Sequence, residues 1–187
     1  MLCQACHLPS RRFLCSRCRG LLRPAPERVL EGGIRVVAAF EHMGVARDLV
    51  LGLKYRGLTT FADLVVDTLA PRVAPVPVVP VPRTWSRQIR YGVDPAQEIA
   101  IRLARKLGVP KLDLLSSPLH APRRAGGDHH RPAPRFRAGT LPGGRFMLVD
   151  DVVTTGATIR SAVESLGVER IALVIAANLA DTVSSPR

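Results

Sequence analysis

The chain is organised around a strand, a loop and a helix that follow one another in RFMLVDDVVTTGATIRSAVESL, which begins at Arg145. The apolar run Phe146–Val149 is typical of a strand buried on both faces of a parallel sheet. The carboxylates of Asp150 and Asp151 follow it, and then two β-branched residues and a small, hydroxyl-rich loop. Apolar residues at helical spacing predict a helix that ends near Gly167. A strand that passes through a loop into a helix predicts an α/β fold with a mostly parallel sheet flanked by helices.

The loop and the two carboxylates together predict a site for a sugar phosphate. In an open α/β sheet, ligands bind beyond the carboxyl ends of the strands, and a helix N-terminus offers unpaired N–H groups and a partial positive charge. Gly156 lets the backbone approach a phosphate, and Thr154, Thr155 and Thr158 supply hydroxyl donors. Because two carboxylates repel an anion, we expect them to accept hydrogen bonds from sugar hydroxyls, or to hold water on a metal ion. The alternative is an ordinary strand, acidic turn and helix cap.

The same residues resemble the phosphoribosyl-diphosphate (PRPP) motif of type I phosphoribosyltransferases, in which an apolar run, two acids and two apolar residues precede TTGAT. The resemblance implies a type I phosphoribosyltransferase-like fold. It also implies that Asp150 and Asp151 are the catalytic carboxylates and hold the ribose hydroxyls. The residues that would hold PRPP or its phosphate are Val152, Val153, Thr154, Thr155, Gly156, Ala157 and Thr158.

All four cysteines lie in the first 18 residues, as two CxxC pairs separated by eight residues. Two such pairs complete the tetrahedral four-thiolate shell that Zn²⁺ prefers in structural sites. Disulfides are the alternative, but a chain without an export signal is expected in a reducing compartment. Metal ligation would supply the folding energy of so short a segment, on the order of 10 kcal/mol, and the zinc would be structural or form a platform for a partner. The predicted ligands are Cys3, Cys6, Cys15 and Cys18.

The net charge of +12 comes mostly from arginine and is unevenly distributed. Residues 83–145 hold 13 basic and 4 acidic side chains. A basic concentration of this kind attracts phosphates, either of a nucleotide or of a nucleic-acid backbone, and arginine suits bidentate phosphate contact. The alternative for each single arginine is a solvated position. The nucleic-acid candidates in this interval are Arg90, Arg123, Arg124, Arg131, Arg135 and Arg137.

Proline and glycine divide the chain into three parts. The interval 24–33 is expected to be a linker between the four-Cys knuckle of residues 1–23 and a domain of residues 34–187. Asp94, Pro95 and Gln97 together form a capping box at the start of one helix. Hydrophobic periodicity predicts strands over 34–40, 76–81 and 171–177, helices over about 45–57, 60–70 and 95–107, and a polar tail over 178–187.

Several segments resemble the ComF family, in the family's order, over about residues 3–177. They are the four-Cys knuckle, the segment LKYRG at Leu53–Gly57, the strand PVPVVPVP followed by basic residues, and the PRPP motif near the end. Members of that family are phosphoribosyltransferase-like proteins linked to bacterial competence, the uptake of single-stranded DNA. The resemblance implies PRPP or a phosphorylated ribose as ligand, with single-stranded DNA and competence-machinery proteins as partners.

Two segments depart from the family pattern. Where the family shows Arg-Gly-Phe-Asn-Gln, this chain has Tyr91-Gly92-Val93-Asp94-Pro95, with Arg90 available to replace the arginine. The later polar segment, here 123–136, lacks the family's Gln and Asn. In phosphoribosyltransferases the equivalent region closes over PRPP and excludes water. Residues 121–140 are therefore expected to form a mobile loop, and its altered polar residues bear on catalysis.

Three functions are compatible with these observations. The leading one is a ComF-type protein that binds PRPP or a phosphorylated ribose and handles internalised single-stranded DNA. The second is an active transferase, in which Mg²⁺ and Arg83 or Arg87 hold pyrophosphate while an unknown acceptor attacks the ribose. The third is a regulatory protein that senses PRPP without turnover. No apolar run reaches the roughly 20 residues that span a bilayer, and the first residues lack an apolar signal core, so we expect a cytoplasmic protein that is not integral to a membrane.

Overall fold

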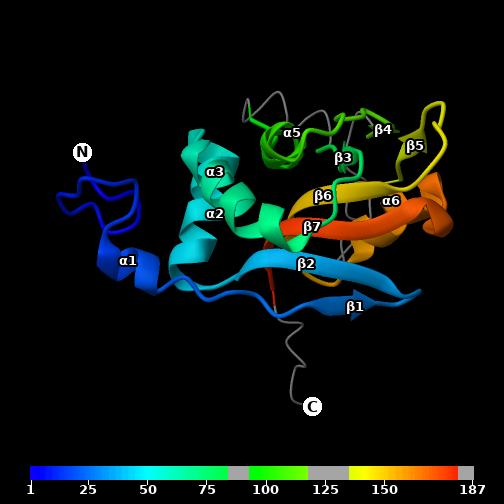
Figure 1. The fold of residues 1–187 in the computed structure, drawn as a ribbon. Coiled ribbons are helices and arrows are strands. Elements are labelled where there is room, and N and C mark those ends of the chain that lie inside the picture. The colour runs from blue at the N-terminus through cyan, green and yellow to red at the C-terminus, as the bar shows by residue number, and fades with distance from the viewer. Residues whose placement is uncertain (84–92, 118–134, 181–187) are drawn as a thin grey trace, which may run out of the picture.

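The computed structural model describes residues 1–83, 93–117 and 135–180. Its centre is a five-stranded sheet with the strand order β1-β2-β7-β6-β3 (Figure 1). Four of these strands are parallel to one another, and β1 pairs antiparallel with β2 at one edge. The strands are β1 (Arg28–Leu30), β2 (Ile34–Glu41), β3 (Val78–Pro80), β6 (Phe146–Val153) and β7 (Ile171–Leu179).

Helices cover both faces of the sheet (Figure 1). The face formed with α2 (Gly44–Arg56), α3 (Thr60–Leu69) and α5 (Pro95–Leu107) buries the larger apolar cluster. The opposite face is covered by α6 (Ala157–Leu166), which follows β6 directly. The predicted α/β architecture with a mostly parallel sheet is therefore present.

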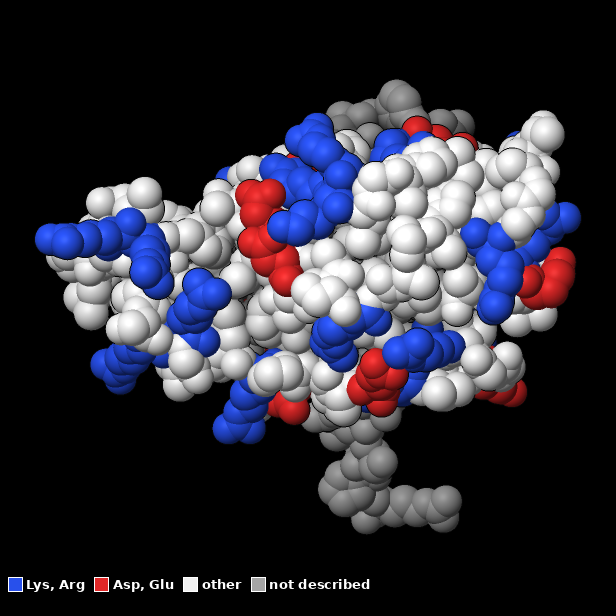
Figure 2. Space-filling view, viewed as in Figure 1, with Lys and Arg blue, Asp and Glu red and all other residues white. Residues whose placement is uncertain are grey.

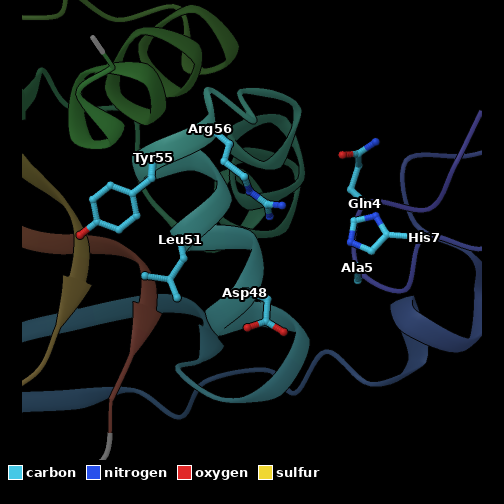
Figure 3. Close-up of a pocket in the computed structure, with 7 residues that line it drawn as sticks. All are labelled: Gln4, Ala5, His7, Asp48, Leu51, Tyr55 and Arg56. Carbon is cyan, nitrogen blue, oxygen red and sulfur yellow. The ribbon is translucent and has the colours of Figure 1, made fainter. Parts of the chain in front are cut away.

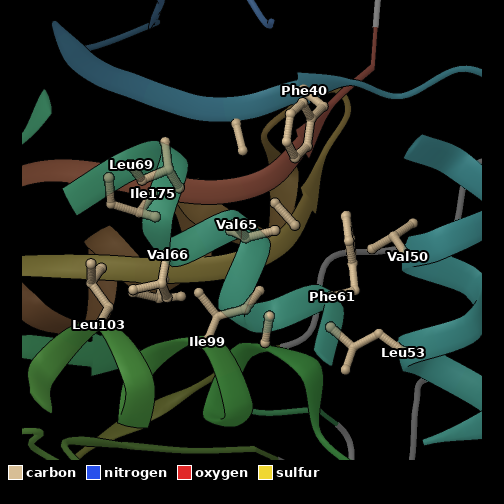
Figure 4. Packing of buried hydrophobic residues seen from close by; sticks show 14 of the residues in the cluster. Phe40, Val50, Leu53, Phe61, Val65, Val66, Leu69, Ile99, Leu103 and Ile175 are labelled. Carbon is tan, nitrogen blue, oxygen red and sulfur yellow. The ribbon is translucent and has the colours of Figure 1, made fainter. Parts of the chain in front are cut away.

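Strand β6 is buried on both faces, as its apolar run predicts. Phe146 and Leu148 pack in the cluster beneath α6, whereas Met147 and Val149 pack in the cluster beneath α3 and α5. All four side chains have no exposed surface. On the helical side, Phe61 of α3 fills the space between α2 and the sheet, and its ring centroid lies 6.2 Å from that of Phe40 (Figure 4). The strand is thereby held between two apolar layers, which fixes the position of the acids at its end.

The interval 24–33 is not simply the linker that its prolines and glycines predict. Residues 28–30 form β1, which pairs with residues 34–36 of β2 through a turn at Gly32 and Gly33. Pro24 also forms an isolated bridge with Phe40. This interval pairs because β2 has an open edge, and an unpaired row of N–H and C=O groups favours a further strand.

The expected mobile loop of residues 121–140 lies outside the described residues up to residue 134. Its described end contains β5 (Arg137–Ala138), which pairs antiparallel with β4 (Leu115–Ser116) in a small second sheet. The described chain also contains a short helix, α1 (Ser16–Gly20), inside the four-Cys knuckle. Two 3₁₀ turns complete the elements, η1 (Ala70–Arg72) and η2 (Val168–Arg170).

Helix α5 begins where its cap predicts, but only half of the expected capping box forms. The carboxylate of Asp94 accepts hydrogen bonds from the backbone N–H groups of Ala96 and Gln97. The Gln97 side chain does not return to the cap, because its amide donates to Asp113 and accepts from Lys111 instead. The helix therefore starts on one carboxylate, which is itself buried.

Strand lengths differ from the predictions at the carboxyl edge of the sheet. Strand β6 continues through Asp150 and Asp151 to Val153, because this part of the strand pairs with the longer β7. Strand β7 includes Asn178, which the polar-tail prediction excluded, and which is completely buried. Strand β3 covers only residues 78–80 of the expected 76–81. The extra length of β6 and β7 carries the carboxylates into the site described next.

Candidate functional site

The carboxyl ends of β3 and β6 and the last turn of α2 meet around Asp151. Lys54 of α2 places its Nζ atom 2.9 Å from Asp151 Oδ2, and Arg83, just beyond β3, places a guanidinium nitrogen 3.5 Å from the same oxygen. The three side chains are only 12–18% exposed. One carboxylate thus contacts two cations in a region with little water, where such interactions are stronger than at the surface.

Asp150 has a different environment from its neighbour. Its Oδ1 atom accepts a hydrogen bond of 2.7 Å from the backbone N–H of Asp151. Loss of hydration on burial, and next the negative charge of Asp151, raise the pKa of Asp150 to about 7. Asp150 therefore carries a proton for part of the time near neutral pH. A carboxyl group that carries a proton can donate a hydrogen bond as well as accept one, so Asp150 can take either role toward a sugar hydroxyl.

Arg83 is held in place by several partners. Its guanidinium donates to the backbone carbonyls of Lys54 and Val93, and its own N–H donates to the buried carboxylate of Asp94 at 3.0 Å. Burial raises the pKa of Asp94, although the hydrogen bond from Arg83 opposes that effect. Arg83, expected to bind pyrophosphate, thus cross-links α2, the start of α5 and the acid pair.

The hydroxyl-rich loop lies between β6 and α6. Thr154 and Thr155 are exposed, and Gly156 adopts a left-handed φ of 75° as the N-cap of α6. Arg28 donates to the carbonyl of Thr154 and Arg160 donates to the carbonyl of Thr155, at 3.3 and 2.9 Å. The N–H of Ala157 donates to Thr155 Oγ1 at 3.4 Å. The other N–H groups and the hydroxyls of the loop lie at the helix N-terminus, which is an arrangement suited to an anion.

The remaining predicted phosphate residues differ in what they can offer. Val153 is buried in the core beneath α6, and its carbonyl accepts from the N–H of Ala180. Val152 and Thr158 are half-buried at the edge of the site. The side-chain hydroxyls and the backbone N–H groups of the loop are therefore the groups that can contact a phosphate.

Asn178 fixes the hydrogen-bonding state of His42 beside this site. The Asn178 Nδ2 atom lies 2.9 Å from the carbonyl of Ala46 and 3.2 Å from His42 Nδ1. Because a carbonyl only accepts, Nδ2 must face Ala46, and its second hydrogen then donates to His42 Nδ1. Burial, and next the positive charge of Lys54, lower the pKa of His42. Both effects favour the neutral imidazole of His42, with its proton on Nε2.

The four cysteines of the knuckle converge. Their sulfur atoms all lie within 4.8 Å of one another, and the sulfurs of Cys6 and Cys15 are 3.8 Å apart. A tetrahedral Zn²⁺ with bonds of about 2.3 Å requires sulfurs about 3.8 Å apart. Backbone N–H groups, first that of Cys6, lower the pKa of Cys3 to about 6, whereas burial raises the pKa of Cys18 to about 12. The group can hold a metal ion, which would stabilise all four thiolates.

Other predicted site residues are not brought to this edge by the described structure. Arg135 is exposed, as is Arg137 on β5. Arg87 and four nucleic-acid candidates, Arg90, Arg123, Arg124 and Arg131, lie outside the described residues. Lys54 was not predicted to be a site residue, because a lysine in the last turn of a helix is ordinary. The LKYRG segment, which contains Lys54, was the only feature of the sequence that could have indicated a role for this lysine.

A separate cavity of about 360 Å³ lies between the knuckle and α2 (Figure 3). It is lined by Gln4, Ala5, His7, Asp48, Leu51, Tyr55 and Arg56. None of these residues belongs to the acid pair or to the phosphate loop. Among the lining residues, Tyr55 is 53% exposed.

The fold and the site define an open α/β protein with an acid pair beside a helix N-terminus, where proteins of this architecture bind phosphorylated ligands. A model of the phosphoribosyl transferase domain matches residues 33–186. The match covers most of the chain, so the protein belongs to that family. The predicted type I phosphoribosyltransferase-like fold is thereby confirmed.

Solved structures of phosphoribosyl enzymes are similar to this chain at low identity. The orotate phosphoribosyltransferase of Aeropyrum pernix is 20% identical, with 88% of this chain and 90% of that chain covered and a TM-score of 0.38. The adenine phosphoribosyltransferase of Leishmania donovani is 15% identical, with 83% and 86% covered and a TM-score of 0.42. The phosphoribosylpyrophosphate synthetase of Mycobacterium smegmatis is 22% identical, with 68% and 34% covered and a TM-score of 0.33.

No curated protein sequence matches the chain at a significant level. Within the described residues, none of the helices has the length and apolarity that a membrane crossing requires.

Proposed function

We propose that this protein binds PRPP, or a related phosphorylated ribose, at the carboxyl edge of β6. The observation that carries the proposal is the placement of Asp150 and Asp151 directly before an exposed loop at the N-terminus of α6. The loop supplies N–H and hydroxyl donors for a 5′-phosphate. The two acids, which lie a few residues earlier in the chain, supply acceptors for the ribose hydroxyls.

Lys54 and Arg83 extend the site to the diphosphate of PRPP. In the structure both cations contact Asp151. When ribose hydroxyls occupy the acid, the same cations become available to a diphosphate, which carries more charge than the carboxylate does. Mg²⁺ suits this site as a cation shared between a carboxylate and substrate phosphates, where it would neutralise diphosphate charge.

The cellular role that we propose follows the ComF resemblance. The protein would act in the cytoplasm, in the handling of internalised single-stranded DNA during natural competence. The net charge of +12 supports a polyanionic partner. Zn²⁺ in the four-Cys knuckle would have a structural role there.

An active transferase is the second candidate, and the pairing of Lys54 and Arg83 with Asp151 favours it. Two cations at one end of the site can stabilise the negative charge that develops on a departing diphosphate. The observable difference from a PRPP sensor is turnover, because only a transferase releases pyrophosphate in the presence of an acceptor.

Calorimetric titration with PRPP tests the binding proposal. We expect Asp150→Asn/Asp151→Asn to weaken PRPP binding at least about tenfold, the loss of roughly one charge-assisted hydrogen bond. If the acids acted only through their charge, the same change would remove repulsion and strengthen binding of the anion. Ribose 5-phosphate and pyrophosphate, titrated separately, divide the effect between the two ends of the site.

The matched control is Asp63→Asn/Asp67→Asn, which replaces the same number of aspartates at exposed positions on α3. It should bind PRPP as the wild type does. Equal affinity of the wild type and the Asp150/Asp151 variant would refute the proposed site. Pyrophosphate release with a panel of acceptors then separates the transferase from the sensor.

A further inference from the structure

The four-Cys knuckle has an unusual charge pattern. Residues 1–26 contain five arginines and no Asp or Glu. Nucleic-acid binding was predicted for residues 83–145, whereas the knuckle was predicted only to hold a metal or to form a partner platform. The five arginines are Arg11, Arg12, Arg17, Arg19 and Arg23.

These arginines are exposed and are not neutralised by the described part of the protein. All five side chains are exposed, and the residues that the structure describes place no carboxylate within ion-pair distance of them. On the body of the molecule, by contrast, Arg102 pairs with Asp63, and Lys106 with Asp67. On the face that Figure 2 shows, blue surface on the body adjoins red, whereas the knuckle at the left shows only blue and white.

Metal binding would reduce this positive charge without cancelling it. A zinc ion with four thiolates carries two negative charges, fewer than the five positive charges of the arginines. The cysteine cluster also fixes the backbone that carries the arginines, since α1 holds Arg17 and Arg19 on either side of Cys18. A rigid arrangement of cations loses less conformational entropy on binding than a flexible tail does.

The same segment of the chain also exposes apolar side chains. Leu2, Leu8 and Leu21 are 52%, 59% and 58% exposed. A single-stranded nucleic acid presents a phosphate and an unstacked base face at each nucleotide, so exposed cations can contact its phosphates while exposed apolar side chains contact base faces. A duplex hides its base faces in the stack and would leave these leucines exposed.

From these observations we infer that the outer surface of the knuckle, formed by the five arginines and the three exposed leucines, binds single-stranded nucleic acid through its phosphates. The inference deepens the proposed role in DNA handling and rests on it. It assigns the contact to a surface separate from the PRPP site. Sequence preference is weak, because phosphate contacts carry little sequence information.

The test is fluorescence anisotropy with a labelled oligothymidylate, measured from about 50 to about 300 mM salt on the full chain, the range in which phosphate contacts weaken steeply. The knuckle variant is Arg12→Gln/Arg17→Gln/Arg19→Gln. The control, Arg105→Gln/Arg135→Gln/Arg137→Gln, removes the same charge at exposed positions on the body and includes two of the earlier candidates. Zinc content and far-UV circular dichroism verify that both variants are folded.

We expect the knuckle variant to bind the oligothymidylate at least about tenfold more weakly at the lowest salt concentration. The slope of its log Kd against log salt concentration should be smaller by about two. The control should keep the wild-type slope. An equal loss in both variants, or a loss in the control alone, overturns the assignment to the knuckle. Competition by polyglutamate as effective as competition by unlabelled oligonucleotide would also overturn it, in favour of an acidic protein partner.

The same proteins separate this inference from the proposed function. PRPP titration of the knuckle variant should match that of the wild type, since the arginines are not part of the acid site. If the wild type binds oligothymidylate and the control alone loses it, DNA handling stands and the knuckle assignment fails. If the wild type does not bind oligothymidylate at all, both fail, while PRPP binding is judged by its own titration.

Discussion

At the scale of single residues, Asp150 is the side chain whose position most clearly destabilises the folded state. Its carboxyl group is desolvated and lies beside the charge of Asp151, and both effects disfavour ionisation. Asp151 differs in that Lys54 and Arg83 lie beside it. A desolvated acid whose pKa is strongly raised marks a candidate functional site.

We predict that Asp150→Asn stabilises the unliganded protein at pH 8 by on the order of a few kcal/mol, although it impairs PRPP binding. With its pKa raised to about 7, folded Asp150 retains a proton that the unfolded chain releases above about pH 4. The free energy of unfolding therefore falls as pH rises through this window in the wild type, and the variant lacks that contribution. Urea unfolding at several pH values measures the difference.

The comparison between the two proteins isolates Asp150, because groups such as His42 titrate in both. Asp48→Asn, a change at an exposed acid, should leave the wild-type pH dependence intact. If the free energies of unfolding of the wild type and of Asp150→Asn changed in parallel between about pH 4 and pH 8, the raised pKa of Asp150 would be contradicted.

At the scale of elements, β1 supports the phosphate loop from outside. Strand β1 pairs with β2 at the edge of the sheet, yet Leu30 lies against Gly156, and a Cβ atom on that glycine would come within 2.8 Å of the leucine side chain. Arg28 of the same strand donates to the carbonyl of Thr154. The interval expected to be a linker therefore helps to set the conformation of the loop.

We predict that Gly156→Ala destabilises the protein by about 1–2 kcal/mol, since a left-handed φ of 75° disfavours a Cβ atom. It should also weaken PRPP binding, because the loop must shift from Leu30. Thermal unfolding and PRPP titration measure the two effects. Gly143→Ala is the control, because a methyl group at that position would meet nothing within 4 Å and the φ of Gly143 is not left-handed.

Adding Leu30→Ala to Gly156→Ala separates contact from backbone strain. The double variant removes the steric contact but keeps the unfavourable φ. PRPP affinity should therefore recover in part, while the loss of stability that comes from backbone strain remains. Full-strength PRPP binding and unchanged stability in Gly156→Ala would show that the loop conformation is unimportant.

At the scale of the whole molecule, the knuckle is packed on the domain rather than attached by a flexible chain. Cys3, Leu14 and Cys18 are at most 5% exposed and belong to the same apolar cluster as α2 and α3. The cysteine site and the main core are therefore physically coupled. Loss of the metal should therefore destabilise α2 as well as the first residues.

We predict one zinc per chain in the reduced protein, measured by elemental analysis. Chelation should abolish hydrogen-exchange protection in residues 1–23 and lower the unfolding temperature, because metal ligation is folding energy in a segment without a core of its own. The sheet should remain protected, since its two apolar clusters are formed mainly by other elements. Unchanged protection in residues 1–23 after metal removal would contradict a structural site.

Local patterns in the sequence were sufficient to predict the strand, acids, loop and helix from Phe146 to Leu166, the ends of α5 and the convergence of the four cysteines. Each depends on interactions between residues close in the chain: periodic burial, a cap, or paired knuckles. The pairing of β1, the burial of Asn178 against Ala46, and the contact of Lys54 and Arg83 with Asp151 were decided only by the tertiary structure. Their partners are mostly distant in sequence, and no local pattern records which chain segments an open sheet edge or a buried carboxylate will meet.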